Sequence, residues 1–541
     1  MSKKKQQPEI VSMDASEWEA LRSELQKYLP PALYEKVAAV LETFEWLMRR
    51  IEKKDTTLGR LHRWIFGAKT EKTKNVFPPP PAAEKTSSSP KPPRKGHGRN
   101  GADQYVGAQQ ITVNHPTLQE GGRCPECKTD KARLRQLRPS RIVRIIAQPI
   151  FLATLFALQQ LRCKLCGKVY TAPAPPEAGI SKYDPNVGVM LGFLRFGSGL
   201  PHYRMAKMQR DFGVPLPAGT QWELMAETTR ALEPVHRELI TVAAQGQLLH
   251  NDDTPMRVQS LKQERTRSES ERTGIFTTGI ISKVGDHSIA LFWTGANHAG
   301  ENLDELLKNR AQGLEKPIQM CDALSRNRSK EFEVLLANCL PHGRRNFVDV
   351  AENFPSQCQK VLEELGQVFH HDAEARKKKL SPSERLVFHQ QQSRPIMEGL
   401  KKWMQEQLDQ KQVEPNSGLG DAFGYMLDHW EPLTLFLRVP GAPVDNNICE
   451  RALKMAILHR KNSLGYKTQN GARVGDLFMS LIHTCRLAAV NPFDYLTSIV
   501  SHANCVLKDP SQWLPWNYRQ AIPTDLLARG AQASARASPG N

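Results

Sequence analysis

The earliest regular pattern of apolar side chains is a heptad repeat over residues 33–66. One seam position of the repeat is held by Val37, Phe44, Ile51, Leu58 and Ile65, and the other by Val40, Leu47, Lys54 and Leu61. Four heptads with one charged intrusion predict a coiled coil through which copies of the chain associate. An amphipathic helix that packs within its own domain would give a similar pattern and stays open as the alternative.

Two further helices are predicted between residues 203 and 232. The first carries the basic residues Arg204, Lys207 and Arg210, and Gly213 follows it as a helix-stop signal. Thr220 and Glu223 have the spacing of a capping box, which predicts the start of the second helix. The apolar face expected for that helix consists of Trp222, Met225, Ala226 and Thr229. The pair is compatible with a helix-turn-helix that reads DNA, although any small helical domain produces such a pattern.

From Gly246 the pattern changes to strands. Short apolar runs lead into Asp252 and Asp322, and residues 274–282 and 288–294 flank a turn as a hairpin. Residues 301–310 have a helical pattern, and residues 334–339 have the pattern of a last strand. Strand, hairpin, helix, strand, strand is the order of an RNase H-like core, in which the fourth strand lies beside the first. Asp322 would then lie next to Asp252.

Two CxxC pairs precede these elements. They are formed by Cys124 and Cys127 and by Cys163 and Cys166, with 35 residues between the pairs. Two such knuckles predict a structural zinc site, with a hairpin of residues 142–146 and 151–161 filling the interval. A redox role would require only one CxxC motif and a thioredoxin-like context, which the flanking sequence lacks.

The charge of the chain favours a polyanionic partner. Its 541 residues include 74 Lys and Arg against 56 Asp and Glu, a formal net charge of +18. The N-terminus lacks the apolar core of a signal peptide, and the most apolar run, residues 150–158, is far shorter than the ~20 residues needed to cross a bilayer. We therefore expect a cytoplasmic protein without membrane contact.

Three acidic residues carry the candidate chemistry. Asp252 and Asp322 follow apolar strands, whereas Glu450 lies near the start of a basic helix that Asn446 or Asn447 can cap. Carboxylates from two strand ends and one helix can converge on a pair of Mg²⁺ or Mn²⁺ ions that clamp a phosphoryl displacement. The alternative for Glu450 alone is an exposed ion pair with Lys454, one helical turn away.

The basic residues near these acids are candidate DNA contacts. Those on the predicted Glu450 helix are Arg451, Lys454, Arg460 and Lys461, and those after Cys339 and His342 are Arg344 and Arg345. Cys339 and His342 alone are too few ligands for a metal site, so this motif is interpreted as turning its basic residues toward DNA or as packing. In the proline-rich linker, Arg94, Lys95 and Arg99 are candidates for minor-groove contact, with a solvated basic linker as the alternative.

These patterns predict a multidomain α/β protein in which the RNase H-like catalytic core contains a helical insertion and follows a coiled-coil helix, a zinc-binding module and a helical DNA-binding module. The expected divisions are the N-terminal helical region 1–75, the Pro/Lys-rich linker 76–104, the zinc-binding module 105–180, the helix-turn-helix-like module 181–245, the first part of the core 246–346, the helical insertion 347–440, the part of the core with the Glu-bearing helix 441–505, and the C-terminal tail 506–541.

The chain resembles transposases of the insertion-sequence-66 family, in the DDE, RNase H-like class. The stretches that carry the resemblance are residues 61–67, residues 95–99, the paired CxxC motifs, residues 250–255, residues 339–347, residues 445–453 and residues 460–462. The Asn446-Asn447-x-x-Glu450-Arg451 block is the most specific of them. The chain has Asp253 where family members usually have Glu, and Ala323-Leu324 where they commonly have Gly-Tyr.

The resemblance implies that Asp252, Asp322 and Glu450 are the catalytic carboxylates. It implies a bacterial DNA transposase that binds element ends and target DNA as a homo-oligomer, associates with the nucleoid when bound to DNA, and works with possible element-encoded accessory proteins. Metal-dependent strand cleavage and transfer would then need no covalent protein intermediate. Two alternatives stay open: a non-catalytic descendant that regulates or bridges element ends, and a structure-selective nuclease that cuts without joining.

Overall fold

The computed structural model describes residues 15–31, 33–43, 112–122, 150–162, 168–268 and 274–522, with a few further residues between 76 and 166. The chain divides into two compact units, of which the first comprises Met1–Pro78 and Ala153–Asn541 and the second Pro79–Leu152. In the second unit, backbone hydrogen bonds join Gly121 and Gly122 to Leu134. The elements described below belong to the first unit. Among the described residues, no helix is long and apolar enough to cross a membrane.

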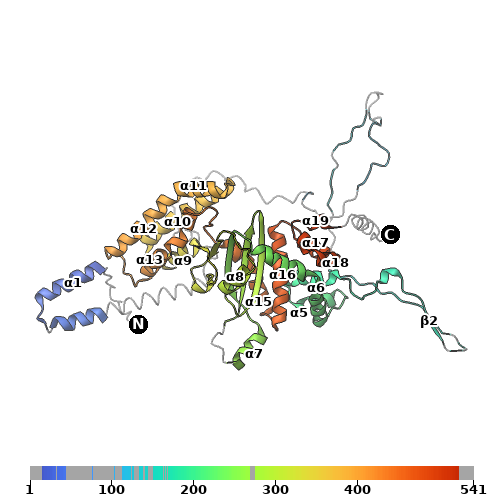
Figure 1. The fold of residues 1–541 in the computed structure, drawn as a ribbon, viewed down its shortest axis with the longest axis horizontal. Helices are drawn as coiled ribbons and strands as arrows, with labels where there is room; N and C mark the ends of the chain where they lie inside the picture. The colour runs from blue at the N-terminus through green and yellow to red at the C-terminus, as the bar shows by residue number, and fades with distance from the viewer. Residues whose placement is uncertain are drawn as a thin grey trace, which may run out of the picture. The chain divides into compact units, whose positions relative to one another are not determined.

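The centre of the first unit is a mixed five-stranded sheet (Figure 1). Its strands are β3 (Leu248–Pro255), β4 (Phe276–Val284), β5 (His287–Gly295), β6 (Ile318–Cys321) and β7 (Leu335–Asn338), in the order β5-β4-β3-β6-β7. β3, β4 and β5 are antiparallel neighbours, whereas β6 lies parallel to β3 and β7 parallel to β6. The predicted α/β class is confirmed, and the hairpin and the placement of the fourth strand beside the first are as expected from the sequence.

The two faces of the sheet are covered by different helices. α15 (Asn447–Ser463) packs against β3 and β4, and so does α8 (Ala299–Leu307). Gly279 of β4 faces α15, because a Cβ at this position would lie 3.0 Å from the Leu453 side chain. Its neighbour Thr278 faces α8, where its hydroxyl accepts a hydrogen bond from Asn302 Nδ2 at 2.7 Å. Since successive side chains of a strand point to opposite faces, α15 and α8 define the two sides of the sheet.

β5 is an edge strand of the sheet, and α16 (Gln469–Leu487) lies along its outer edge. The backbone N–H groups of Ala290 and Phe292 donate to the hydroxyls of Thr484 and Ser480, each at 3.0 Å, and that of Thr294 donates to the Asp476 carboxylate at 2.7 Å. The contacts use every fourth residue of the helix, a rise of about 6.0 Å, and every second residue of the strand, a rise of about 6.8 Å. Because these two distances are similar, the residues stay aligned over three contacts. Side chains of α16 thus accept hydrogen bonds from backbone N–H groups of β5 that would otherwise be open to pairing with another strand.

Between β7 and α15 the chain forms a helical segment (Figure 1). Its helices are α9 (Leu340–Val350), α10 (Pro355–Lys377), α11 (Pro382–Gln392), α12 (Arg394–Asp409), α13 (Gly418–Asp428) and α14 (Trp430–Leu433). Buried side chains such as Leu362, Met397 and Phe423 form one continuous core with Met320 and Ala337 of the sheet. The segment therefore packs on the β6–β7 side, and the chain returns where Leu340 N donates to Val444 O at 3.1 Å.

Before the sheet, α4 (Asn186–Gly192) leads through a π-helical turn to α5 (His202–Asp211) and α6 (Ala218–Ala243). α5 ends before Gly213, at a φ of +75°, as the glycine predicts. The expected capping box was wrong: α6 begins at Ala218, and Pro217 precedes it without a side-chain cap. Extended Pro217 starts the helix early, so Thr220 already lies in its first turn.

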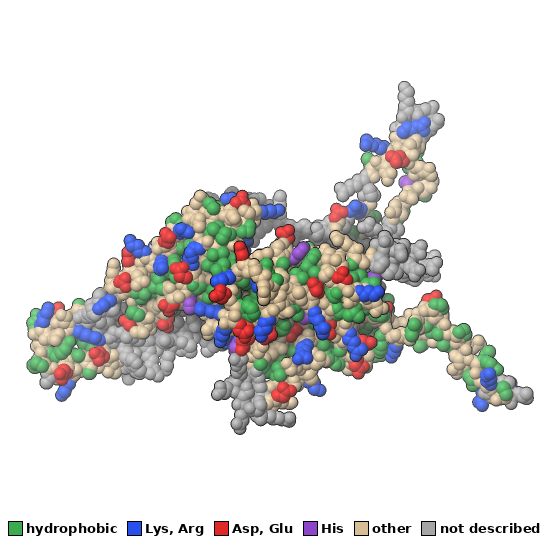
Figure 2. All heavy atoms as spheres, viewed as in Figure 1, with side chains coloured by type: hydrophobic (Ala, Val, Ile, Leu, Met, Phe, Trp, Pro, Cys, Tyr) green, Lys and Arg blue, Asp and Glu red, His purple; other side chains and the backbone are tan. Residues whose placement is uncertain are grey.

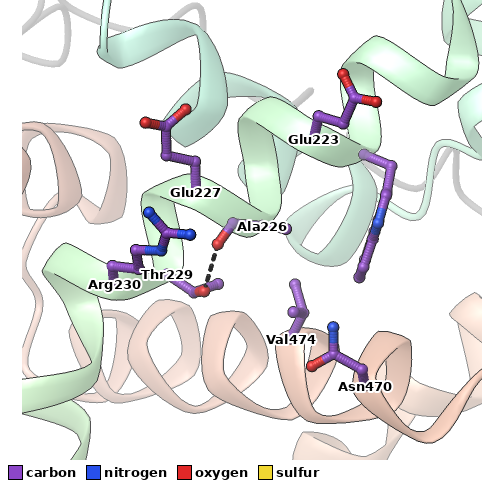
Figure 3. A pocket seen from close by; sticks show the side chains of 8 residues that line it. Glu223, Ala226, Glu227, Thr229, Arg230, Asn470 and Val474 are labelled. Carbon is purple, nitrogen blue, oxygen red and sulfur yellow. Dashed lines mark hydrogen bonds between the residues drawn. The ribbon is translucent and has the colours of Figure 1, made fainter.

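The buried face of α6 also differs from the expectation. Of the four predicted apolar positions only Met225 is buried, and the buried row continues through Leu232 and Leu239. α6 packs against α4 and α16 and runs to the edge of the sheet. Trp222, Ala226 and Thr229 instead line a shallow pocket between α6 and α16 (Figure 3).

The remaining described elements are mostly short helices: α1 (Ala15–Tyr28), α7 (Gln259–Ser268), α17 (Pro492–Ser501), α18 (Ala503–Lys508) and α19 (Tyr518–Ala521). Residues 33–43 are helical, and the rest of the predicted heptad repeat lies outside the described residues. β1 (Gln160–Arg162) and β2 (Val169–Thr171) pair as a two-stranded sheet. The hairpin expected from residues 142–146 and 151–161 is therefore wrong in its partner, since Leu161 pairs with Tyr170.

Candidate active site

Asp252 and Asp253 are adjacent on β3 but face opposite sides of the sheet. Asp252 pairs with Gly279, on the α15 side, and Asp253 pairs with Thr278, on the α8 side. The Asp253 side chain is 2 % exposed and lies 3.1 Å from His298 Nδ1, at the start of α8, and 3.8 Å from Arg326. Asp253 thus already has partners on its own face, and Asp252 is the acid on the face of Glu450.

The sequence predicted that Asp252 lies at the end of a strand. This prediction is wrong, because β3 continues beyond Asp252. β3 continues its antiparallel pairing with β4 for three more residues, to Pro255. Its parallel pairing with β6 stops earlier, at His250 and Met320. Asp252 therefore lies inside a strand, at the point where one of its two neighbouring strands has ended.

Asp322 directly follows β6, as the sequence predicted. The register that pairs His250 with Met320 brings Asp322 opposite Asp252 when it is continued by two residues, and parallel strands lie about 4.8 Å apart. Asp322 Oδ1 accepts hydrogen bonds from Asn327 Nδ2 at 2.7 Å and from the backbone N–H of Leu324 at 3.2 Å. These two bonds fix the orientation of the Asp322 carboxylate.

Glu450 lies in the first turn of α15, whose N-cap residue is Asn446. The predicted capping by the Asn446 side chain does not occur. Its Nδ2 instead donates to the backbone carbonyl of Asn251 at 3.1 Å, and its Oδ1 lies 3.0 Å from His250 Nδ1. A buried amide thus joins the start of the Glu450 helix to the strand that carries Asp252.

The charge around Asp252 is strongly negative. Burial, together with the neighbouring Asp322, Asp253 and Glu450 carboxylates, raises the pKa of Asp252 to about 7, against the lowering effect of the Asp253 N–H. A divalent cation would relieve this repulsion, and carboxylate oxygens are the ligands that Mg²⁺ prefers. The residues present therefore fit such an ion.

Glu450 also belongs to a second group. Among the residues that the structure describes, Cys339, His342 and Glu450 have potential ligand atoms that all lie within 4.8 Å of one another, whereas Asp252, Asp322 and Glu450 do not form so close a set. Cys339 is the N-cap residue of α9, and His342 lies in its first turn. The sequence singled out Cys339 and His342 but supplied no third ligand, because Glu450 is more than 100 positions away.

Tyr425 of α13 is a neighbour of this site that the sequence did not reveal. Burial raises the pKa of Tyr425 to about 12, with Asp322 and Cys339 adding to the shift and a backbone hydrogen bond from Ala323 opposing it. Its ring also lies close to Gly343, since a Cβ there would be 3.6 Å from it. No local pattern predicts this proximity, because the helical segment brings Tyr425 back from another part of the chain.

The predicted DNA-contacting residues that the structure describes fall into three groups. Arg451, Lys454 and Lys461 are exposed on α15. Arg460 of the same helix donates to Thr254 Oγ1 at 3.3 Å and to the Pro255 carbonyl, so it also braces the end of β3. Arg345 is exposed and Arg344 half-buried on α9. On the face seen in Figure 2, basic side chains of the described parts alternate with acidic ones.

Several predicted residues lie outside the part of the chain that the structure describes. They are Arg94, Lys95, Arg99, Cys124, Cys127 and Cys163. Cys166 is described and is an exposed free cysteine between β1 and β2. The zinc site and the linker contacts therefore stay predictions. The pocket in Figure 3 is lined by none of the predicted site residues.

A family model described as "Transposase IS66 family" matches residues 181–474, which is more than half of the chain. The chain is also similar to "Uncharacterized protein y4hP" of Sinorhizobium fredii (strain NBRC 101917 / NGR234), with 23% identity over 389 residues that cover 68% of each chain. It is 25% identical over 368 residues to "Uncharacterized protein y4jD" of the same organism, covering 66% of this chain and 71% of the relative. The matched family region contains β3, β6, the whole of α15 and all three acids.

Proposed function

The chain belongs to the IS66 family of transposases, and from this premise we propose that it cleaves and joins DNA through Asp252, Asp322 and Glu450 on an RNase H-like core. The observation that carries the proposal is the arrangement of β3, β6 and α15. β6 runs parallel to β3, and the Asn446 amide joins α15 to β3. Burial and the nearby Asp322, Asp253 and Glu450 carboxylates together raise the pKa of Asp252.

Each acid has a distinct structural support. Asp252 is held within a paired strand opposite Gly279, whose missing side chain leaves room for α15. Asp322 is oriented by Asn327, which itself accepts a hydrogen bond from Asn251 Nδ2 at 2.7 Å through its carbonyl. Glu450 is positioned by the first turn of α15, which the Asn446 amide joins to β3. The carboxylates would hold Mg²⁺ or Mn²⁺, and such ions supply stabilisation of the charge that develops on the attacking and leaving oxygens.

The basic residues of α15 suit the binding of a DNA backbone. Arg451 and Lys454 are exposed in the same helical turns as Glu450, so they would hold a phosphate near the carboxylates. Arg344 and Arg345 on α9 would extend this contact. Self-association through residues 33–66 would bring two element ends together, and the zinc cysteines would stabilise a separate module.

The test uses the full chain and duplex DNA from the regions that flank its coding sequence. We expect end-specific nicking in Mg²⁺ that stops with a chelator, followed by transfer of the freed 3′ end to a target duplex. Nicking without transfer would indicate the structure-selective nuclease instead. End binding without either reaction, in Mg²⁺ and in Mn²⁺, would indicate the non-catalytic descendant.

A further inference from the structure

We infer that Cys339, His342 and Glu450 form a binding site for a transition-metal ion of the zinc class, separate from the proposed magnesium site but sharing Glu450 with it. The potential ligand atoms of the three residues lie within 4.8 Å of one another. Neighbouring ligands on a tetrahedral zinc ion are about 3.5 Å apart, given Zn–S of about 2.3 Å and Zn–N of about 2.0 Å. Small rotations of His342 and Glu450, which are both only half-buried, would close the difference.

The chemistry of these ligands selects the ion. A thiolate and an imidazole bind zinc and its neighbours in the transition series far better than magnesium, which prefers oxygen ligands and keeps its water. Three protein ligands with one position left for water are typical of an exchangeable or catalytic zinc site rather than a closed structural one. One thiolate and one carboxylate would also neutralise the two positive charges of the ion.

Two details of the structure support a ligand at this position. His342 Nδ1 is buried and has no hydrogen-bond partner among the described residues, which is unfavourable unless an ion or a water molecule binds there. Cys339 Sγ accepts a hydrogen bond from the Asn446 N–H at 3.4 Å. It also lies at the N-terminus of the eleven-residue helix α9. These features oppose, but do not outweigh, the burial that raises the pKa of the Cys339 thiol to about 12, so a metal ion would have to displace the thiol proton when it binds.

The shared carboxylate gives this site a consequence for activity, which rests on the proposed function. When Glu450 binds a zinc ion together with Cys339, it is drawn away from Asp252 and Asp322. The proposed magnesium site then lacks one of its three carboxylates. Micromolar zinc should therefore inhibit magnesium-dependent DNA cleavage, and a chelator selective for zinc should restore it.

The experiment titrates the full-length protein with Co²⁺, which replaces zinc and reports thiolate ligation by its near-ultraviolet charge-transfer absorption. We compare the wild-type protein with Cys339→Ser and His342→Gln, and we use Cys505→Ser, which changes an exposed free cysteine, as the matched control. We expect Cys339→Ser to lose the absorption equivalent to one thiolate and His342→Gln to weaken that component at least tenfold. Cys505→Ser should match the wild type.

Equal titrations of the wild type and both test variants would overturn the inference. His342→Gln decides the question if Cys339→Ser fails to fold, because His342 is half-buried and its Nδ1 has no hydrogen-bond partner among the residues that the structure describes. The proposed function fails in a different way, through magnesium-dependent cleavage that survives Glu450→Gln. Zinc that inhibits cleavage equally in the wild type and in His342→Gln would show that the inhibition arises elsewhere.

Discussion

His250 Nδ1 lies 3.0 Å from Asn446 Oδ1, although 196 positions separate the two residues in the chain. Burial lowers the pKa of His250 to about 3, so its ring is neutral. Asn446 uses its Nδ2 to donate to the Asn251 carbonyl, which turns its Oδ1 toward His250 and makes Nδ1 the protonated ring nitrogen. This pair holds the start of α15 on β3, and with it the distance between Glu450 and Asp252.

Replacement of Asn446 by Ala should therefore impair both stability and cleavage. The change leaves the His250 donor and the Asn251 carbonyl unpaired in the interior, which costs roughly 1–3 kcal/mol for each group. The free energy of unfolding, measured by chemical denaturation, should fall by that order, and DNA cleavage should fall by more than DNA affinity. Asn447→Ala, at the exposed neighbouring position, is the control and should change stability by less than about 0.5 kcal/mol.

Glu450→Gln tests the proposed catalytic role most directly. The substitution keeps the volume of the side chain but removes a charge that a divalent ion requires, so cleavage should fall by at least about 100-fold. DNA affinity should be unchanged or slightly higher, because a negative charge near phosphate is lost. Nicking of an end-labelled duplex and a binding assay on the same preparation measure the two effects. Glu398→Gln, on the exposed side of α12, should leave both unchanged, and a rapid Glu450→Gln enzyme would refute the site.

Asp252→Asn and Asp253→Asn should separate catalysis from structure. Asp252→Asn should reduce cleavage as strongly as we expect of Glu450→Gln. Asp253→Asn weakens the contact with His298 on the other face of the sheet, so it should lower the free energy of unfolding by about 1–2 kcal/mol while most cleavage activity survives below the melting temperature. If Asp253→Asn is as inactive as Asp252→Asn at full folding, the assignment of Asp252 to the site is wrong.

Asp476 should make stability depend on pH. Burial raises the pKa of Asp476 to about 7, against the lowering effect of its hydrogen bonds from Thr294. The folded protein then holds a proton between about pH 4 and 7 that the unfolded chain has released, so the free energy of unfolding falls as pH rises through this window, by at most about 1.4 kcal/mol per pH unit. Asp476→Asn cannot titrate. The stability difference between wild type and variant should therefore shift against the wild type from pH 4 to pH 7, and a constant difference would contradict the assignment.

Local sequence signals predicted the parts of this fold that depend on nearest neighbours. The apolar runs before Asp252 and Asp322 and the glycine of the β4–β5 turn identified the strands, and Asn446 and Asn447 marked the start of the Glu450 helix. They also predicted the order of the elements, because short connections and parallel pairing leave few arrangements. The capping box at Thr220 failed because Pro217 provides an earlier start that is stronger than the hydroxyl signal.

The polar connections of the site could not be predicted in this way. The helical segment separates His250 from Asn446, and Cys339 from Glu450, along the chain, and no periodicity relates residues so far apart. The connection between α16 and β5 is an exception, because a pattern in the sequence indicates it. Asp476, Ser480 and Thr484 recur every four residues among the apolar residues of α16, which is the pattern expected of polar side chains that hydrogen-bond to a buried neighbour.

The hydrogen bonds from β5 to α16 can form only late in the synthesis of the chain. β5 is complete at Gly295, but the three side chains that cover its edge end at Thr484. Ribosomes add roughly 5–20 residues each second, so the edge stays open for about ten to forty seconds while the intervening residues emerge. During that interval each nascent chain exposes strand donors to its neighbours on the same messenger. Slow synthesis of the helical segment would prolong this exposure. A truncated chain that ends before α16 would keep an unpaired strand edge, which can pair with other chains and cause aggregation.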